Sequence, residues 1–126
     1  MLSASHNRAY QDFLTLLAEF KSSLIDSEVE TTSFQVKQKF EELQQWFEKN
    51  IASLDEQEIE QEIIASWQSV HTEIKREFKL LTTDILFLAS ARQSQTQTKR
   101  LQSISDRTTK LIGYCQIMLK RMRNEG

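Results

Sequence analysis

The fold is decided by residues 59–90, which read IEQEIIASWQSVHTEIKREFKLLTTDILFLAS. Apolar residues recur there every three or four positions, which is the spacing of one face of an α-helix. That face consists of Ile59, Ile63, Trp67, Val70, Ile74, Phe78, Leu81, Ile85 and Leu88. Residues 78–89 are apolar around much of the helix circumference, so we expect other helices to cover them on more than one side.

The beginning of this helix is predicted near Ser53. Ser53 and Glu56 have the spacing of a capping box, in which each side chain binds the backbone N–H of the other residue. The helix dipole also favours negative charge in a first turn. The acidic residues of this region are Asp55, Glu56, Glu58, Glu60 and Glu62. No helix breaker precedes Arg92, so we expect a helix of roughly 35 residues, about 50 Å long.

Three further segments carry the same periodicity. They run from about Ser5 to Leu24, from Thr32 or Ser33 to about Ile51, and over residues 101–122. Polar residues 26–32 are predicted to be a loop, and residues 93–98 are a polar gap before the last helix. The last segment alternates spacings of three and four, as in a coiled coil. Its seam is Leu101, Ile104, Thr108, Leu111, Cys115, Met118 and Met122, and it ends with the cations Lys120, Arg121 and Arg123.

Composition favours an all-α fold. The 126 residues suit a single domain over residues 1–126, and 39% hydrophobic with 27% charged residues is typical of globular proteins. Proline is absent and the only glycines are Gly113 and Gly126, whereas a β protein needs such residues in its tight turns. Because the polar gap before the last helix is short, the sequence predicts an antiparallel four-helix bundle with a long hairpin formed by helices three and four.

Charge is divided unevenly along the chain, whose formal net charge is −2. Residues 1–63 hold 13 acidic and 5 basic side chains, a net of −8, and residues 64–126 hold 5 acidic and 11 basic ones, a net of +6. A chain that is negative as a whole is not suited to general polyanion binding, because neutralising phosphates requires a basic surface. We therefore expect no nucleic-acid partner.

Antiparallel pairing brings the acidic start of the third helix beside the basic end of the fourth, where their charges cancel. The opposite end of the hairpin carries Arg92, Lys99 and Arg100 without compensation. We interpret these three residues as a candidate partner-binding patch. A merely solvated surface is the alternative, since most surface charges contribute little.

Residues for metal or covalent chemistry do not converge in the sequence. A ferritin-like site needs Glu-x-x-His pairs, but His6 and His71 are the only histidines, and Gln68 stands three residues before His71. Cys115 lies on the apolar seam of the fourth helix, where we expect a small buried hydrophobic residue and not a nucleophile. We therefore expect no enzyme, no metal and no cofactor.

Asp84 and Gly113 interrupt their helical patterns. A buried carboxylate needs a partner, and Arg107 lies about one turn from the level that faces Asp84 in the hairpin. We predict a structural Asp84–Arg107 pair, with a catalytic carboxylate as the alternative. Gly113 costs roughly 1 kcal/mol relative to Ala inside a helix. We expect a close helix approach near Ile74 to compensate, with a hinge as the alternative.

Several apolar residues fall off the four seams. Each of them either widens a buried face or, if several are exposed together, marks a protein interface. They are Phe34, Trp46, Ile64, Leu80, Phe87, Ile112 and Ile117.

The sequence also bears on the compartment. No run reaches the roughly 18 apolar residues of a membrane span, and residues 1–6 lack the pattern of a secretory signal. The single Cys115 has no partner for an internal disulfide, which fits a reducing compartment. We expect a cytoplasmic chain with no membrane partner.

Two strings resemble a small cyanobacterial family, the heterocyst frequency control protein PatD family. They are SWQSVHTEIKREFKLLTTDILFLASARQ, from Ser66 to Gln93, and DRTTKLIGYCQIML, from Asp106 to Leu119. The string YQDFLTLL, from Tyr10 to Leu17, agrees more weakly.

This resemblance implies a non-enzymatic regulator of heterocyst differentiation that binds the tubulin-like cell-division protein FtsZ and promotes its assembly. It assigns no binding residues. Two alternatives stay open. One is a homo-oligomeric scaffold or adaptor for another protein partner, a homodimer included. The other is a transcriptional regulator, for which neither a short recognition helix nor a large basic face is evident.

Overall fold

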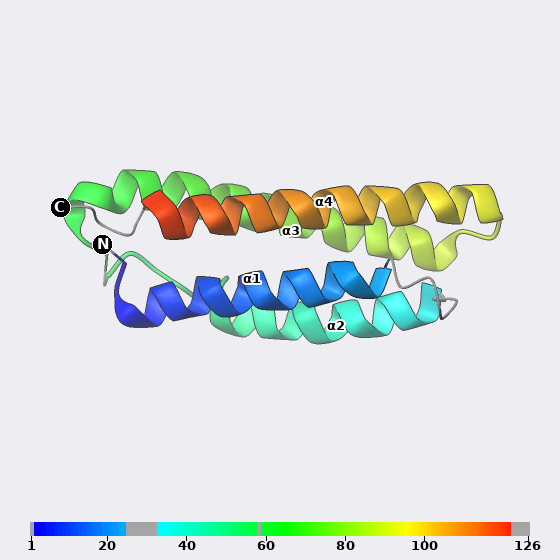
Figure 1. The fold of residues 1–126 in the computed structure, drawn as a ribbon, viewed down its shortest axis with the longest axis horizontal. Helices are drawn as coiled ribbons and strands as arrows, with labels where there is room; N and C mark the ends of the chain where they lie inside the picture. Colours follow the sequence, from blue (N-terminus) through cyan, green and yellow to red (C-terminus); the bar gives the residue numbers. More distant parts are fainter. Residues whose placement is uncertain (1, 25–32, 58, 122–126) are drawn as a thin grey trace.

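The computed structural model describes residues 2–24, 33–57 and 59–121. Its α-helices are α1 (Ala4–Leu24), α2 (Ser33–Asn50), α3 (Ile64–Ser90) and α4 (Ser94–Arg121), and the 3₁₀ turn η1 (Gln61–Ile63) leads into α3. No strand occurs within these described ranges. The predicted all-α four-helix bundle is confirmed (Figure 1). The expected loop at 26–32 and the positions of Glu58, Met122 and Arg123 lie outside the described residues.

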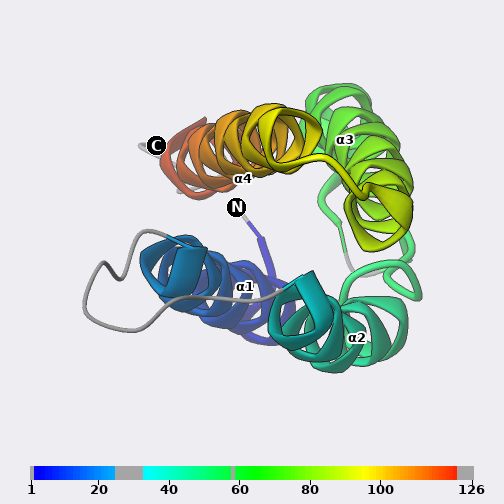
Figure 2. The same ribbon diagram turned by 90° about the vertical axis from the view of Figure 1, so that its right-hand side faces the viewer.

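The helices form two layers, each of them an antiparallel pair (Figure 2). One layer is the predicted hairpin of α3 and α4, which pack against each other along most of their length. In the other layer, α1 lies against α4 and α2 lies against α3. Because α3 and α4 have 27 and 28 residues and α1 and α2 only 21 and 18, the closed end of the hairpin extends past the second layer (Figure 1).

The apolar stripes meet between the two layers, which explains why these amphipathic segments are stable as helices together. The largest fully buried side chains come from all four helices and the α2–α3 connection. They are Tyr10, Phe13, Leu17, Phe40, Ile51, Ile74, Leu81, Leu88, Ile104, Leu111 and Met118. Thr108 and Cys115, the two less apolar members of the predicted seam of α4, are also fully buried.

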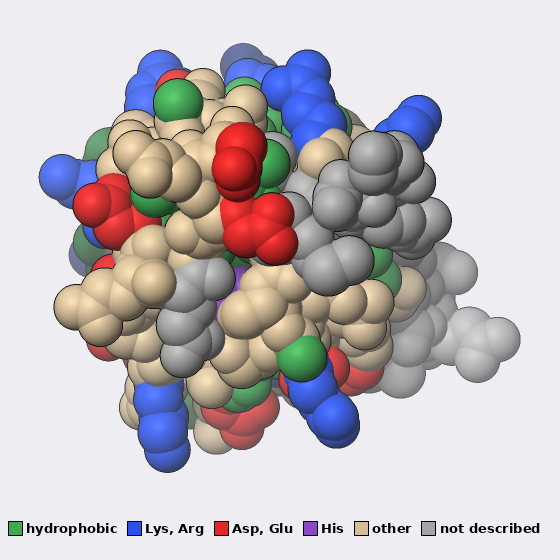
Figure 3. Space-filling model, turned by 90° about the vertical axis from the view of Figure 1, so that its left-hand side faces the viewer, with side chains coloured by type: hydrophobic (Ala, Val, Ile, Leu, Met, Phe, Trp, Pro, Cys, Tyr) green, Lys and Arg blue, Asp and Glu red, His purple; other side chains and the backbone are tan. Residues whose placement is uncertain are grey.

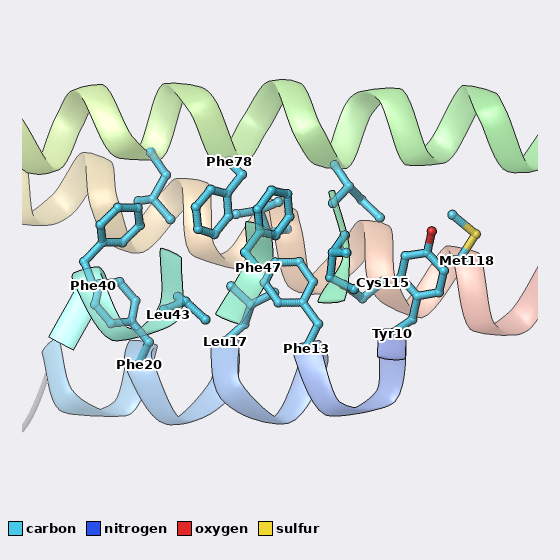
Figure 4. Close-up of a cluster of buried hydrophobic side chains, with 14 of the residues drawn as sticks. Tyr10, Phe13, Leu17, Phe20, Phe40, Leu43, Phe47, Phe78, Cys115 and Met118 are labelled. Atoms are coloured by element: carbon cyan, nitrogen blue, oxygen red, sulfur yellow. The ribbon is translucent and has the colours of Figure 1, made fainter. Parts of the chain in front are cut away.

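Aromatic rings of α2 pack against rings of α1 and α3 (Figure 4). Phe78 of α3 stacks on Phe47 of α2, with ring centroids 3.9 Å apart, and on Phe40 at 5.3 Å. Phe13 of α1 approaches Phe47 at 5.2 Å and Phe78 at 6.0 Å. Each such pair contributes about 0.5–1.5 kcal/mol beyond the burial of its area. Phe78 is therefore the point at which three helices are joined.

The predicted start of the third helix near Ser53 is wrong. Ser53 Oγ donates to the carbonyl of Lys49, 2.6 Å away, and closes α2 instead of opening α3. The Asp55 carboxylate accepts from the backbone N–H of Gln57 at 3.0 Å, and Glu56 accepts from the Gln68 side chain. Short polar side chains that bind nearby backbone N–H groups compete with helix formation. As a result the acidic residues precede α3, which has 27 residues where roughly 35 were expected.

The expectation that residues 78–89 are covered on more than one side is also wrong near the closed end of the hairpin. Leu86 is 57% exposed and Phe87 is 48% exposed. Ile85 and Leu88 in the same turns are 2% and 1% exposed, so the bundle covers one side of these turns and Leu86 and Phe87 project from the uncovered sides. This end of the hairpin therefore presents apolar surface to solvent.

Gly113 does not mark a close helix approach. A Cβ atom built at this position meets no heavy atom within 4 Å. The helix-propensity cost of the glycine is therefore not offset by contact with Ile74 or any other described residue, and the structural expectation was wrong.

Candidate functional site

The predicted patch at the closed end of the hairpin is only partly a set of free cations. Arg92 lies exposed in the turn between α3 and α4, and Lys99 is exposed on α4. Arg100 is 39% exposed in its side chain and reaches Asp84 Oδ1 at 3.9 Å. Its guanidinium also covers the ring of Phe87, 4.6 Å from the centroid. The expectation that all three cations are uncompensated is therefore wrong for Arg100.

The structure brings Asp84 and Arg107 together. Asp84 on α3 is 4% exposed, and Arg107 Nε on α4 donates to its Oδ2 atom. Ser103 Oγ donates to the same oxygen at 2.9 Å. A carboxylate bound by a guanidinium and a hydroxyl is satisfied within the helix interface, which is the structural role predicted for this pair.

A second buried acid, Glu77, is 1% exposed and was not predicted from the sequence. Arg107 Nη1 and Lys110 Nζ each lie 3.3 Å from its carboxylate oxygens, and Arg76 lies at 3.9 Å. Glu77 stands seven residues before Asp84, so both acids project from the same side of α3. Arg100 and Arg107 on α4 are also seven residues apart. These two matching spacings are the sequence signal from which the ion network could have been predicted.

Arg107 is the shared member of this network. Burial lowers the pKa of its guanidinium, but hydrogen bonding to Asp84, the charge of Asp84 and the charge of Glu77 outweigh burial, so the pKa stands above its ordinary value. Arg107 therefore stays charged at every accessible pH, and the network is held by a permanent cation.

A second polar cluster lies near the other end of the bundle, inside the core. Trp67 Nε1 donates to Tyr10 Oη at 2.9 Å, and Tyr10 Oη and His71 Nδ1 share a hydrogen bond 2.8 Å long. Because the Tyr10 oxygen already accepts from Trp67, we assign the tautomer in which the Tyr10 hydroxyl donates to Nδ1. The indole of Trp67 stacks on the His71 ring at 4.5 Å. Tyr10 lies beside Cys115 and Met118 in this part of the core (Figure 4).

Burial governs the acid–base properties of the Tyr10–His71 pair. It lowers the pKa of His71 to about 4, with further lowering from the charges of Lys75 and His6, and it raises the pKa of Tyr10. With Nδ1 accepting a hydrogen bond, the neutral imidazole carries its proton on Nε2, which has no partner among the described residues. At neutral pH the pair is a hydrogen-bonded core element and not a general base.

Cys115 and His6 are both buried in the packed interior of the bundle. Cys115 is fully buried, and burial raises the pKa of its thiol to about 12, so it is not a thiolate at neutral pH. This confirms its predicted core position. His6 Nε2 lies 3.0 Å from the backbone oxygen of Asp55 and thereby ties α1 to the α2–α3 connection.

A groove of about 420 Å³ lies between α1 and α2. Its apolar floor comes from Leu16, Phe20, Leu43 and Trp46, and Glu19 and Glu42 lie on its rim. Asp84 does not line this groove, so the catalytic alternative for that carboxylate gains no support from it. Among the described residues, no group of three or more His, Cys, Asp or Glu side chains is placed to hold a metal ion.

The apolar residues that fall off the seams divide into two groups. Trp46, Ile64, Leu80 and Ile112 are half-buried and widen the buried faces. Phe34, Phe87 and Ile117 are exposed, at 71%, 48% and 37%. Leu86, which the seam analysis did not single out, belongs to the exposed group. The strongest concentration of exposed apolar surface on neighbouring residues is therefore Leu86 and Phe87, beside Arg100.

The opposite end of the bundle has a different character. It is the end at which α3 begins and α4 finishes, and in Figure 3 acidic side chains lie on it, with Lys and Arg side chains around the rim. None of the helices in the described ranges is both long and apolar enough to cross a bilayer.

Comparisons with protein-family models, curated proteins and solved structures find no match to this chain. The class that the described residues define is a helical bundle with an internal ion network and an exposed hairpin end.

Proposed function

We propose that this chain is a non-enzymatic, cytoplasmic regulator of heterocyst differentiation frequency, and that it binds FtsZ and promotes FtsZ assembly. The partner and the process come from the resemblance to the PatD family. The structural support is the hairpin end, where Leu86 and Phe87 are exposed and Phe87 lies beside Arg100. Exposed aromatic and aliphatic side chains next to Arg are typical of protein interfaces.

The resemblance and the structural feature fall on the same part of the chain. The string from Ser66 to Gln93 covers nearly all of α3 and the turn, and the string from Asp106 to Leu119 covers the second half of α4. Within these strings lie Glu77, Asp84 and Arg107, the residues that fix the two helices in register. A rigid hairpin is suited to presenting a constant surface to a partner.

Promotion of assembly requires only preferential binding. A protein that binds polymer subunits more tightly than free subunits shifts the equilibrium towards polymer by its difference in affinity. No reaction is needed, and in the described residues the buried acids Glu77 and Asp84 are both engaged by cations. Electrostatic attraction between exposed Arg92 and Lys99 and an acidic partner surface would raise the rate of encounter.

Co-sedimentation with purified FtsZ polymer in the presence of GTP tests this proposal. The double variant Arg92→Glu with Lys99→Glu should sediment with polymer to less than about a third of the wild-type amount. Lys39→Glu with Lys49→Glu is the matched control, because it makes the same charge change at two exposed positions on α2. Absence of wild-type co-sedimentation, or equal loss in both double variants, would contradict the proposal.

The exposed apolar residues also favour a second candidate, a homo-oligomeric scaffold. Burying Leu86 and Phe87 of two copies against each other would hide the largest adjacent apolar side chains that the described surface presents. Sedimentation equilibrium separates the candidates. A dimer that Leu86→Ser converts to monomer favours the scaffold, and a wild-type monomer at micromolar concentration dismisses it.

A further inference from the structure

The outer surface of the α3–α4 hairpin is strongly positive. Residues 64–121 contain ten Lys and Arg and four Asp and Glu, a net of +6. Two of the four acids, Glu77 and Asp84, are buried between the helices, so only Glu73 and Asp106 have carboxylates that reach solvent. The helices α1 and α2 together contain five basic and five acidic residues, so they carry no comparable excess of positive charge. The positive charge belongs to one layer of the bundle.

Four of these cations line the junction of α3 and α4, and we call them the cationic seam: Arg76, Arg100, Arg107 and Lys110. All four reach the buried carboxylates from the solvent side. Their side chains are nevertheless 61%, 39%, 28% and 63% exposed, in that order. Glu77 is shared among three cations, so donors on each of them remain directed towards water.

The buried carboxylates hold these donors in place. Arg107 is fixed by Asp84 and Glu77 together, and Arg100 is fixed by Asp84 and by the ring of Phe87. An anion that binds a preorganised guanidinium avoids part of the entropy cost of ordering it. The cationic seam is therefore a better anion receptor than the same number of freely moving surface lysines.

The exposed ring of Phe87 lies at one end of the cationic seam, beside Arg100. Arg76 and Phe87 are eleven residues apart on α3, which is about three helical turns. They consequently lie on the same side of the helix, separated by roughly 16 Å along its axis. A ligand that spans this distance would meet cations along most of its length and Phe87 at one end.

We propose that the outer face of the α3–α4 hairpin binds an acidic amphipathic peptide segment of a protein partner. The carboxylates of that segment bind Arg76, Arg107 and Lys110, and an apolar side chain packs on Phe87. The inference deepens the proposed function, because it gives the chemistry of the partner segment that the hairpin contacts, and it rests on that function for the partner being a protein. A segment of about 12 residues is long enough to span the face as a helix.

A peptide is favoured over a nucleic acid by the detail of the surface. Glu73 lies 3.4 Å from Arg76 and Asp106 is exposed on α4, so a regularly charged phosphate backbone would meet repulsion within the positive face. Exposed Phe87 offers a contact that suits an apolar side chain. A peptide can place its carboxylates and its apolar residue to match both features.

The test is fluorescence anisotropy of the full chain with a fluorescein-labelled 12-residue peptide, DEELDELFDEEL. The chain should bind this peptide, and binding should weaken as salt is raised from 50 to 300 mM. The double variant Arg76→Gln with Lys110→Gln should bind roughly tenfold more weakly, as expected for the loss of two exposed charge pairs. Both residues are more than half exposed and Glu77 retains Arg107, so this variant should fold, which circular dichroism checks.

Three controls make the test specific. Lys39→Gln with Lys49→Gln, on α2, should leave peptide affinity within twofold of wild type. Phe87→Ser should weaken binding of the peptide but not of an oligoglutamate of the same length, because only the former carries an apolar anchor. A peptide with every acid replaced by its amide should not bind.

The inference is overturned if the wild-type chain does not bind the acidic peptide, if both double variants bind it equally, or if a DNA duplex binds more tightly. Its failure is distinguishable from failure of the proposed function. FtsZ co-sedimentation without peptide binding removes this inference alone. If the wild-type chain binds the peptide, the Arg76→Gln, Lys110→Gln variant does not, and the chain does not co-sediment with FtsZ, this inference is supported and FtsZ is removed as the partner.

Discussion

Arg107 on α4 donates from Nε to the Oδ2 atom of Asp84 on α3, a residue 23 positions earlier in the chain. Asp84 is almost completely buried, and the same guanidinium reaches Glu77 at 3.3 Å. One side chain therefore binds two interior carboxylates, which Arg76, Arg100 and Lys110 also reach. This relationship fixes the register of the hairpin.

Replacing Arg107 with Ala should lower the free energy of unfolding by about 3 kcal/mol, because buried Asp84 then keeps only Ser103 and, at 3.9 Å, Arg100 as partners. Urea denaturation followed by circular dichroism measures this change. Arg8→Ala is the control, since Arg8 is 82% exposed and its pair with Asp12 is 3.9 Å long. That variant should change stability by less than about 0.5 kcal/mol. Equal effects of the two substitutions would contradict the role assigned to Arg107.

Stability should fall as the pH is lowered through the range in which His71 titrates. The folded-state pKa of His71 is about 4, below its ordinary value of 6.5. Between these values the unfolded chain binds a proton that the folded chain does not, so acidification favours unfolding, and below about pH 4 this group adds no further loss. The loss attributable to His71 between pH 7 and pH 5 should be about 2 kcal/mol.

The variant His71→Gln isolates this effect, because a Gln side chain offers an oxygen to Tyr10 without titrating. Unfolding in urea at pH 7 and pH 5 should show a smaller decrease for the variant than for wild type. Parallel decreases in the two proteins would mean that His71 is not responsible for the pH dependence.

Phe78 should be among the most sensitive core positions. Its ring contacts Phe47, Phe40 and Phe13, and it is 3% exposed. Phe78→Ala should lower the free energy of unfolding by about 3–5 kcal/mol, the usual cost of removing a buried phenyl ring. Phe34→Ala, at a position that is 71% exposed, should stay within about 0.5 kcal/mol of wild type in the same thermal or chemical unfolding experiment.

Gly113→Ala should stabilise the protein. No heavy atom lies within 4 Å of the Cβ that the substitution adds, and alanine is favoured over glycine inside a helix by about 1 kcal/mol. Thermal unfolding should therefore shift to higher temperature. A lower unfolding temperature would indicate that Gly113 has a packing or bending role that the structure does not display.

Periodicity was sufficient to predict the helices, because the buried face of each one repeats over several turns. Tyr10, Phe40 and Leu111 are buried as their positions on the stripes require. The boundary before α3 was not predictable in this way. It depends on side chains that bind outside the helix pattern, such as Asp55 to the backbone of Gln57 and Glu56 to Gln68.

Long-range polar contacts account for the other differences. Asp84 was recognised because it interrupts an apolar stretch, but Glu77 stands among other charged residues and resembles an ordinary surface acid. Its burial depends on Arg107 and Lys110, which belong to another helix. The hydrogen bond between Tyr10 and His71 likewise joins residues 61 positions apart, a separation at which sequence spacing carries no information.

The central proposal is that the chain promotes FtsZ assembly by binding through the outside of its α3–α4 hairpin. The most direct test is the critical concentration for GTP-dependent FtsZ polymerisation, measured by light scattering with and without an equimolar amount of this chain. We predict that wild type lowers the critical concentration and that the Arg92→Glu, Lys99→Glu variant does so much less. An unchanged critical concentration with the wild-type chain would contradict the claim.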